Sequence, residues 1–212
     1  MISRLHYITQ DLPDFSHAEL AEFACKGGAD WVQLRVKNKS FDEWKKISEE
    51  IKLVCLRYRA KLIINDNVQI AKEISADGVH LGKEDMDPKE ARKILGNNSI
   101  IGGSANSMED VRRQIADGCD YIGLGPFRHT ATKEKLNPIL GLEGIKAIAE
   151  KFGNQIKMIA IGGIKPEDVE SIIQTGIHGV AVSSAINLGE DKSEMTNRFF
   201  ATLRMTKTVM PL

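Results

Sequence analysis

Eight short apolar segments alternate with longer amphipathic segments along the 212 residues, and this alternation predicts an α/β fold consisting of one parallel (β/α)8 barrel. No Pro-, Ser- or Gly-rich linker divides the sequence, so residues 1–212 are expected to form a single domain. The alternative is a doubly wound open sheet, which typically has about five or six strands. The expected strands are 5–9, 31–35, 61–66, 78–82, 99–104, 121–126, 157–163 and 179–185.

Local signals place helices between these strands. Ser16 with Glu19, and Ser40 with Glu43, have the capping-box spacing that satisfies free N–H groups of a first helical turn. Pro166 is placed where a first turn tolerates proline. Helices are expected to end at three glycines, namely Gly27, Gly118 and Gly176.

A weak internal repeat supports the barrel. The segments ADWVQLR, ADGVHLG, CDYIGLG and IHGVAVS align without gaps and contain the second, fourth, sixth and eighth strands. Because side chains alternate between the faces of a strand, one apolar face of each should lie under the helices. The outward residues are Val32, Leu34, Val79, Leu81, Ile122, Leu124, Val180 and Val182. The inward residues are Gln33, Arg35, His80, Gly82, Gly123, Gly125, Ala181 and Ser183.

The last inward residue of each repeat predicts a site. Layers of four side chains from alternate strands fill such barrels, and the upper layer here is Arg35, Gly82, Gly125 and Ser183. Three small residues around one arginine predict a cavity at the C-terminal mouth, where enzymes of this architecture have their active sites. The alternative is that the glycines only relieve crowding between strands.

The segment QLRVK predicts an anion site at that mouth. Gln33, Arg35 and Lys37 are spaced by two, so all three should leave the strand on its inner side. Burying two cations without a partner is costly, so the pair implies a bound anion. A planar guanidinium and a point charge together suit phosphate or diphosphate. A surface salt-bridge network is the alternative.

The last two strands predict a second phosphate site. IAIGGI ends in a glycine pair, and VAVSSAI ends in a small, hydroxyl-bearing turn. Loops after the seventh and eighth strands form the common phosphate-binding site of this fold. The candidate residues are Gly163, Ser183 and Ser184, although each glycine could also serve only as a turn residue.

Acidic residues follow the third and fourth strands. Asn65 and Asp66 close the third strand, and Asp85 lies in the loop GKEDM. Neighbouring strands are about 4.8 Å apart, so both carboxylates could reach one ion. One or two carboxylates together with substrate phosphates typically hold Mg²⁺, which is therefore the expected metal. Glu84 could substitute for Asp85, and Asp66 could instead cap a helix.

The segment GPFRHTATKEKLNPILG, between the sixth and seventh strands, is longer than most connecting loops. It can fold over the mouth and exclude water, with Thr130 and Thr132 as neutral donors and Lys133 as a third cation. His129 is expected to be solvated. His80 is expected to be a core histidine with its hydrogen bonds satisfied.

Composition excludes other classes of function. The 29 basic and 29 acidic residues cancel, which argues against a nucleic-acid partner. The N-terminus is too polar for a signal peptide, and no apolar run reaches the roughly 18 residues of a membrane span, which predicts a cytoplasmic protein. Cys25, Cys55 and Cys119 are odd in number and widely spaced, so reduced core thiols are expected.

Seven motifs together resemble a known family. QLRVK, NDN, GVHLGKEDM, GGSANS, GLGPFRHTATK, AIGGI and VAVSSAI have the order and spacing of the thiamine phosphate synthase family over residues 5 to 190. The resemblance implies a TIM barrel that joins hydroxymethylpyrimidine diphosphate to hydroxyethylthiazole phosphate with Mg²⁺, yielding thiamine phosphate and diphosphate. It also implies a dissociative reaction, in which diphosphate departs before the thiazole nitrogen traps the pyrimidine methylene cation.

The resemblance implies roles residue by residue. The residues that would contact the pyrimidine diphosphate are Gln33, Arg35, Lys37, Asn65 and Lys133, with Ser104 close to its leaving end. Those that would bind Mg²⁺ are Asp66 and Asp85. Those that would hold the thiazole phosphate are Thr130, Thr132, Gly163, Ser183 and Ser184. Arg35, Lys37, Ser104 and Lys133 are the expected catalytic groups.

Two positions depart from the family pattern. His129 replaces a common proline before the first loop threonine, and Asn106 replaces a histidine found in many relatives. The related thiazole tautomerases use a histidine near that second position, so Asn106 argues against a tautomerase. A tautomerase-like isomerase and a non-catalytic sensor of a phosphorylated thiamine precursor are the alternative functions. The sequence is compatible with a homodimer but does not require one.

Overall fold

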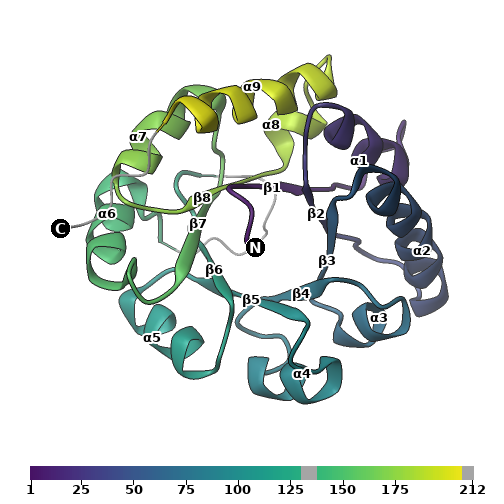
Figure 1. Cartoon of the computed structure of the whole chain (residues 1–212), viewed down its shortest axis with the longest axis horizontal. Helices are drawn as coiled ribbons and strands as arrows, with labels where there is room; N and C mark the ends of the chain where they lie inside the picture. The colour runs from purple at the N-terminus through teal and green to yellow at the C-terminus, as the bar shows by residue number, and fades with distance from the viewer. Residues whose placement is uncertain (130–137, 207–212) are drawn as a thin grey trace.

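The computed structural model describes residues 1–129 and 138–206, which contain a closed parallel barrel (Figure 1). Its strands follow chain order, and β1 pairs with β8, where Leu5 faces Val180. The strands are β1 (Leu5–Ile8), β2 (Trp31–Leu34), β3 (Lys61–Asn65), β4 (Gly78–Leu81), β5 (Ile100–Ala105), β6 (Tyr121–Leu124), β7 (Lys157–Ile161) and β8 (Gly179–Val182). The predicted barrel is confirmed, and the open-sheet alternative is wrong.

Most strands end earlier than predicted, by one to three residues. Asp66, expected at the end of the third strand, has φ 65° instead. Aspartate tolerates this left-handed conformation better than most residues do, and it turns the chain out of the sheet. The strands are shorter because the residues that follow them leave the barrel to form the loops of the mouth.

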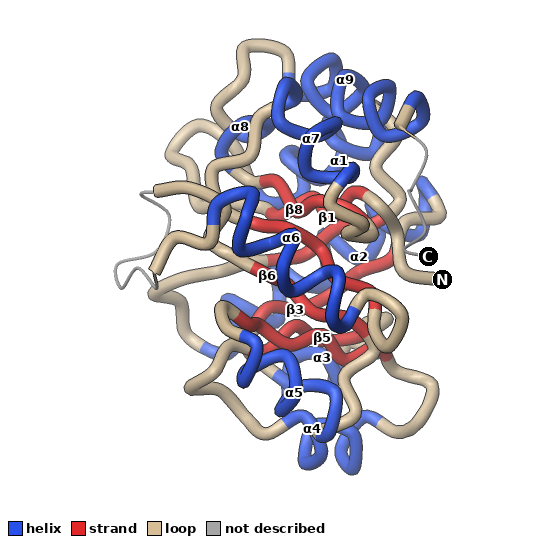
Figure 2. The backbone as a smooth tube through the Cα atoms, turned by 90° about the vertical axis from the view of Figure 1, so that its left-hand side faces the viewer, coloured by secondary structure: helices blue, strands red, loops and turns tan. Residues whose placement is uncertain are grey.

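Helices surround the barrel in Figure 1 and lie on the outside of the strands in both views (Figure 2). They are α1 (His17–Lys26), α2 (Phe41–Tyr58), α3 (Val68–Glu73), α4 (Pro88–Leu95), α5 (Met108–Ala116), α6 (Gly141–Phe152), α7 (Val169–Gln174), α8 (Ser184–Asn187) and α9 (Lys192–Met205). None of the helices in the described ranges is long and apolar enough to cross a membrane.

The predicted helix signals are confirmed. Both capping boxes form, and the serine hydroxyls accept from the N–H groups of Glu19 and Glu43 at 3.2 and 3.3 Å. Pro166 begins a 3-10 turn (Pro166–Asp168) that leads into α7. Gly27 is the C-cap of α1, whereas Gly118 and Gly176 follow the caps of α5 and α7 with φ of 78° and 90°.

Two apolar cores follow from the alternation of side chains along the strands. The outward residues of the repeat, such as Val32 and Leu34, are fully buried between strands and helices. A smaller core fills the barrel interior around Trp31 and Tyr121, whose ring centroids lie 5.4 Å apart. Burying each large apolar side chain contributes about 1.5–3 kcal/mol, so both faces of the sheet stabilise the fold.

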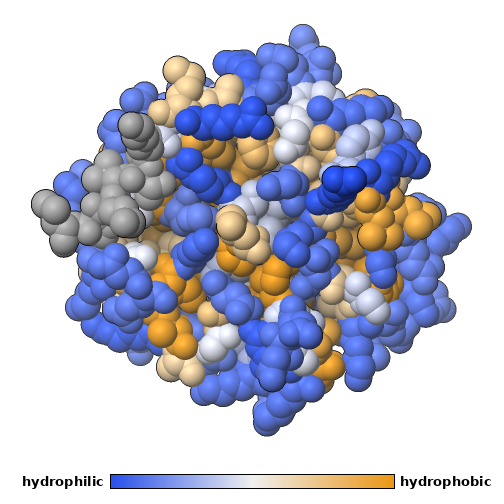
Figure 3. Space-filling model, in the orientation of Figure 1, coloured by the Kyte–Doolittle hydropathy of each residue, from blue (hydrophilic) through white to orange (hydrophobic). Residues whose placement is uncertain are grey.

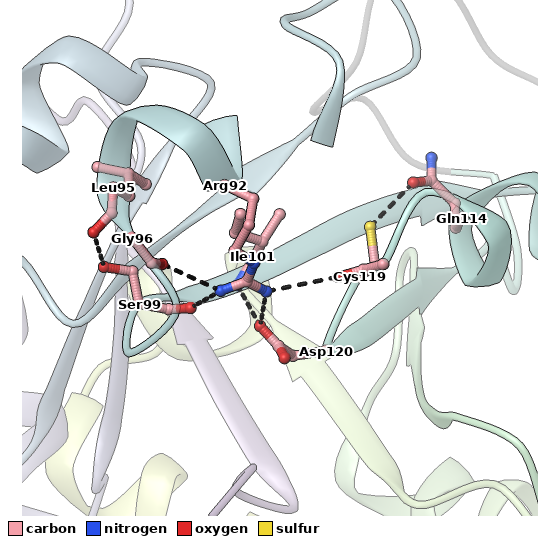
Figure 4. A network of polar contacts seen from close by, with 9 residues as sticks. Arg92, Leu95, Gly96, Ser99, Ile101, Gln114, Cys119 and Asp120 are labelled. Atoms are coloured by element: carbon pink, nitrogen blue, oxygen red, sulfur yellow. Dashed lines mark hydrogen bonds and ion pairs between the residues drawn. The ribbon is translucent and has the colours of Figure 1, made fainter. Parts of the chain in front are cut away.

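The aspartate that precedes the strand in the internal repeat has a structural role in two of its copies. Asp77 and Asp120 precede β4 and β6, and each accepts the N–H of the preceding strand's second residue, Leu62 at 2.9 Å and Ile101 at 2.7 Å. Asp120 also pairs with Arg92 of α4 at 2.7 Å (Figure 4). These carboxylates join neighbouring strands at the end opposite the mouth.

Figure 3 shows the face on which the N-terminus lies, and it is mostly hydrophilic with separated apolar patches. Cys25 and Cys55 are buried and Cys119 is partly buried, and all three are free thiols as predicted. Burial raises the pKa of Cys25 and Cys119 to about 12. These thiols therefore behave as core residues and not as nucleophiles at neutral pH.

Replacing Asp120 tests the carboxylate between strands. Asp120→Ala removes the acceptor of the Ile101 N–H and the partner of Arg92, so the free energy of unfolding should fall by about 1–3 kcal/mol. Denaturant unfolding measures the change. Asp14→Ala, at an exposed aspartate, is the control and should change stability little. Equal stabilities of the two variants would contradict the role of Asp120.

Candidate active site

The predicted site residues within the described ranges lie at the C-terminal ends of the strands. Gln33 of β2 and Asn65 of β3 are both buried, and Gln33 Nε2 donates to Asn65 Oδ1 at 2.7 Å. This bond orients the amide of Asn65, whose own N–H groups remain as donors. Adjacent strands thus present two linked polar side chains to the barrel interior.

The cationic segment, which we define as residues 33–37 (QLRVK), has its backbone held by residues at the end of β1 and in the loop that follows. The N–H of Arg35 donates to Thr9 Oγ1 at 3.1 Å, and the N–H of Lys37 donates to Asp11 Oδ2 at 3.2 Å. His17 bridges these two acceptors, with Nδ1 2.8 Å from Thr9 Oγ1 and Nε2 3.1 Å from Asp11 Oδ1. Thr9, Asp11 and His17 are not predicted by the sequence pattern, because no spacing along the chain links these residues to the strand that follows.

The protonation of His17 follows from these partners. The Asp11 carboxylate can only accept, so the ring hydrogen lies on Nε2, and the Thr9 hydroxyl donates to Nδ1. Burial lowers the pKa of His17, and the nearby Asp11 opposes this shift only in part. A neutral His17 therefore satisfies every group of the clip, which we define as Thr9, Asp11 and His17.

Lys37 is exposed, and its ammonium makes no ion pair with the described part of the chain. The alternative of a surface salt-bridge network therefore has no support at Lys37. A cation whose backbone is fixed while its side chain stays in solvent suits capture of an anionic ligand.

The two predicted metal ligands follow neighbouring strands. Asp66 follows β3, and its N–H donates to the carbonyl of His80 at 2.8 Å, which ties it to β4. Asp85 lies in the loop after β4, where Oδ2 accepts from the N–H of Gly82 at 2.6 Å. The alternative that Asp66 caps a helix is wrong, because Asn67 is the N-cap of α3.

Both aspartates are exposed, as is Glu84, the predicted substitute. Within residues 1–129 and 138–206, no group of three or more His, Cys, Asp or Glu side chains could hold a metal. Two carboxylates suit Mg²⁺, which usually keeps waters and takes further oxygens from substrate phosphates.

The glycines of the predicted upper layer have different roles. A Cβ on Gly82 would lie 2.8 Å from Asp85 Oδ2, so this glycine leaves room for the carboxylate. A Cβ on Gly125 would lie 2.2 Å from the carbonyl oxygen of Ile161. Crowding between β6 and β7 therefore explains glycine at position 125, as the alternative held, and the cavity at the mouth stays a prediction.

The predicted phosphate-binding residues follow β7 and β8, which are paired neighbours. Gly163 has φ 66°, and a Cβ there would lie 2.6 Å from Arg128 Cγ. Arg128 pairs with Asp168 at 2.5 Å. Ser183 accepts from Asn187 Nδ2 at 3.1 Å, and Ser184 begins α8. Glycine at position 163 thus permits both the turn and the close approach of Arg128.

Thr130, Thr132 and Lys133 lie outside the described residues, so their roles stay predictions. His129 is exposed, as expected. His80 is buried, and its two ring nitrogens contact the Tyr121 hydroxyl and Ser104 Oγ, each at 3.0 Å. The prediction of a satisfied core histidine is confirmed.

Comparison with known proteins identifies the family of this site. The family model described as thiamine monophosphate synthase matches residues 5–186. This chain belongs to the thiamine monophosphate synthase family. The thiamine-phosphate synthases of Flavobacterium johnsoniae and Bacteroides fragilis are 47% and 45% identical to it, over 91% and 92% of this chain and 92% and 97% of theirs.

A solved structure supports the same family. The chain resembles the thiamine phosphate pyrophosphorylase from Pyrococcus furiosus with a TM-score of 0.86 and 32% identity, over 95% of this chain and 96% of that one. The resemblance to the thiamine monophosphate synthase family found in the sequence motifs is thus confirmed over nearly the whole chain.

From the contacts of the clip we predict that His17 fixes the backbone of the cationic segment at Arg35 and Lys37. His17→Leu removes both hydrogen bonds of the ring, so the Arg35 and Lys37 amides should exchange with solvent faster, by about tenfold per 1.4 kcal/mol of lost protection. Hydrogen exchange measured by NMR or mass spectrometry tests this.

His178→Leu is the matched control, because the His178 ring is partly buried and contacts the backbone of Ile2 at the opposite end of the barrel. Unchanged exchange at Arg35 and Lys37 in His17→Leu would refute the clip.

Proposed function

We propose that this chain is a thiamine phosphate synthase, which joins hydroxymethylpyrimidine diphosphate to hydroxyethylthiazole phosphate. The observation that carries the proposal is the 47% identity to the thiamine-phosphate synthase of Flavobacterium johnsoniae over 91% of the chain. The mouth of the barrel supports it, because cationic, acidic and phosphate-binding candidates all follow strands whose C-terminal ends meet at one rim.

The reaction exchanges one bond for another. The bond between the pyrimidine methylene carbon and the diphosphate oxygen breaks, and its electron pair leaves with diphosphate. The thiazole nitrogen then donates its lone pair to the methylene cation. No proton moves in either step, so the site needs charge neutralisation and alignment but no general base.

The cationic segment performs the neutralisation. Arg35 and Lys37 bind the diphosphate and offset the negative charge that grows on the departing oxygen. The amide of Asn65, oriented by Gln33, supplies a neutral donor to the same group. Lys133 completes the set from the segment that follows β6. Because the clip fixes the backbones of Arg35 and Lys37, both side chains start from fixed positions at the mouth before the substrate arrives.

Asp66 and Asp85 are the proposed ligands of Mg²⁺. Exposed carboxylates on neighbouring strands fit an ion that takes its remaining oxygens from diphosphate and water. Bound there, Mg²⁺ would neutralise part of the diphosphate charge. The aspartates also reduce the repulsion among the cations when no substrate is present.

The thiazole phosphate is assigned to the loops after β7 and β8. Gly163, Ser183 and Ser184 bind it with backbone N–H and hydroxyl groups, and Thr130 and Thr132 add hydroxyl donors. This arrangement separates the two phosphorylated groups across the mouth, so that the thiazole nitrogen can approach the methylene carbon opposite the diphosphate.

The two alternatives are weaker. Asn106, at the position where tautomerases are expected to have a histidine, accepts a hydrogen bond from Lys83 and offers no titratable group. A non-catalytic sensor would bind the precursors without turnover, which the assay below distinguishes. We also place the enzyme in the cytoplasm without a nucleic-acid partner, because its three cysteines are free thiols and its charges balance.

A product assay tests the proposal. Both precursors with Mg²⁺ should yield thiamine phosphate and diphosphate in equal amounts. Lys37→Ala should lower kcat by about 10²–10³ with an unchanged melting temperature, because the lysine is exposed and acts on developing charge.

Lys46→Ala, which removes an exposed lysine from α2, is the control and should retain full activity. A folded wild-type protein that forms no thiamine phosphate would refute the proposed function. Full activity of Lys37→Ala would refute only the role of the cationic segment.

A further inference from the structure

A chain of hydrogen bonds crosses the barrel interior and ends at the mouth. The Tyr121 hydroxyl contacts Nδ1 of His80 at 3.0 Å, and Nε2 of His80 contacts Ser104 Oγ at 3.0 Å. Two glycines make room for it. A Cβ on Gly102 would lie 2.2 Å from Tyr121 Cζ, and a Cβ on Gly123 would lie 3.0 Å from His80 Cε1. The chain is thus built by three strands, β4, β5 and β6, and by the small residues between its members.

The buried tyrosine at one end of this chain determines which group donates in each of its hydrogen bonds. Tyr121 is 1% exposed and packs edge-on against His6 and Trp31, and burial raises the pKa of its hydroxyl. The tyrosine is therefore protonated and must donate. Within the described residues, Nδ1 of His80 is the acceptor that the hydroxyl can reach. The alternative direction would leave a buried hydroxyl proton without an acceptor, which is costly.

The remaining hydrogen positions follow from that donor. With Nδ1 accepting, the ring hydrogen of a neutral His80 lies on Nε2 and is donated to Ser104 Oγ. The Ser104 oxygen then accepts a hydrogen bond from His80 inside the barrel. The hydroxyl proton of Ser104 can therefore be donated in another direction. Ser104 is partly exposed near the C-terminal end of β5, so that direction is the mouth.

We propose that Tyr121 and His80 are positioning residues that hold the Ser104 hydroxyl as a hydrogen-bond donor toward the departing diphosphate. This inference rests on the proposed function. A hydroxyl whose donor direction is set before the reaction needs no reorientation as charge develops on the leaving oxygen. A serine without the chain could present either its proton or a lone pair, and the lone pair would repel an anion.

The first test reads the tautomer of His80 directly. Correlation spectra of the imidazole ¹⁵N nuclei in the wild-type protein should show His80 neutral with the hydrogen on Nε2. The five histidines are few enough to assign by comparing the spectrum with that of His80→Gln. A neutral His80 with its hydrogen on Nδ1 would overturn the proposal, and this measurement requires neither turnover nor a folded Tyr121 variant.

The second test is a double-mutant cycle on Tyr121→Phe and Ser104→Ala. Ser104→Ala should lower kcat by about 100-fold or more, because it removes the donor. Tyr121→Phe keeps the aromatic packing and removes only the hydroxyl, so kcat should fall by about tenfold while KM changes little. In the Ser104→Ala background, Tyr121→Phe should have no further effect on kcat, because no hydroxyl remains to be oriented.

A purely structural role predicts a different result. The losses from the two substitutions would then multiply, and that outcome, like full activity of Tyr121→Phe, overturns the proposal. Tyr58→Phe is the control, because the Tyr58 hydroxyl donates to Glu22 far from the mouth, and it should leave kcat unchanged.

The dissociation constant of inorganic diphosphate, measured in the presence of Mg²⁺ for the same four proteins of the cycle, is a second readout. Weaker binding of diphosphate by Tyr121→Phe, lost in the Ser104→Ala background, supports the proposal even if the wild-type protein forms no thiamine phosphate. Failure of the positioning chain and failure of the proposed function are thereby distinguished.

Discussion

The pairing of β1 with β8 is the constraint on which the rest of the structure depends. Without it, β2 would lie near one edge of an open sheet, and β7 and β8 would form the other edge. Closure places the loops after β7 and β8 next to β1 and close to β2. Residues 33–37 and residues 183–184, about 150 positions apart in sequence, therefore reach one rim. A reaction that joins two phosphorylated molecules needs such a meeting of two anion sites.

The barrel uses polar side chains differently at its two ends. At the end that carries the N-terminus, Asp77 and Asp120 accept N–H groups of preceding strands and hold the sheet together. At the mouth, the clip and the Gln33–Asn65 pair fix the backbones and amides of residues that remain available to a ligand. The first set contributes stability, and in the proposed function the second contributes the preorganisation on which electrostatic catalysis depends.

The histidines fit a reaction that moves no proton. His6 stacks on Trp31 with centroids 4.1 Å apart, and burial lowers its pKa well below the usual value. His17 and His80 each make two hydrogen bonds through their rings, and His178 contacts the carbonyl of Ile2. These four imidazoles therefore pack against or hydrogen-bond to neighbouring groups, which for His80 include the Ser104 hydroxyl that it is proposed to position, and His129 remains exposed. The proposed site places cations and hydroxyl groups at the mouth, as departure of diphosphate requires.

The sequence by itself determined the number of strands, the face of the four repeat strands that packs under the helices, and the family. Those features depend on local periodicity and on motifs a few residues long, which can be recognised without coordinates. Only the tertiary structure decided which polar groups support the site. Thr9, which contacts His17, accepts from the Arg35 N–H of the neighbouring strand segment, and Tyr121 is linked to Ser104 through His80. A Cβ on Gly125 would clash with the carbonyl oxygen of Ile161. Each of these contacts depends on the register between neighbouring strands and on where each side chain points, and the spacing of residues along the chain encodes neither of these.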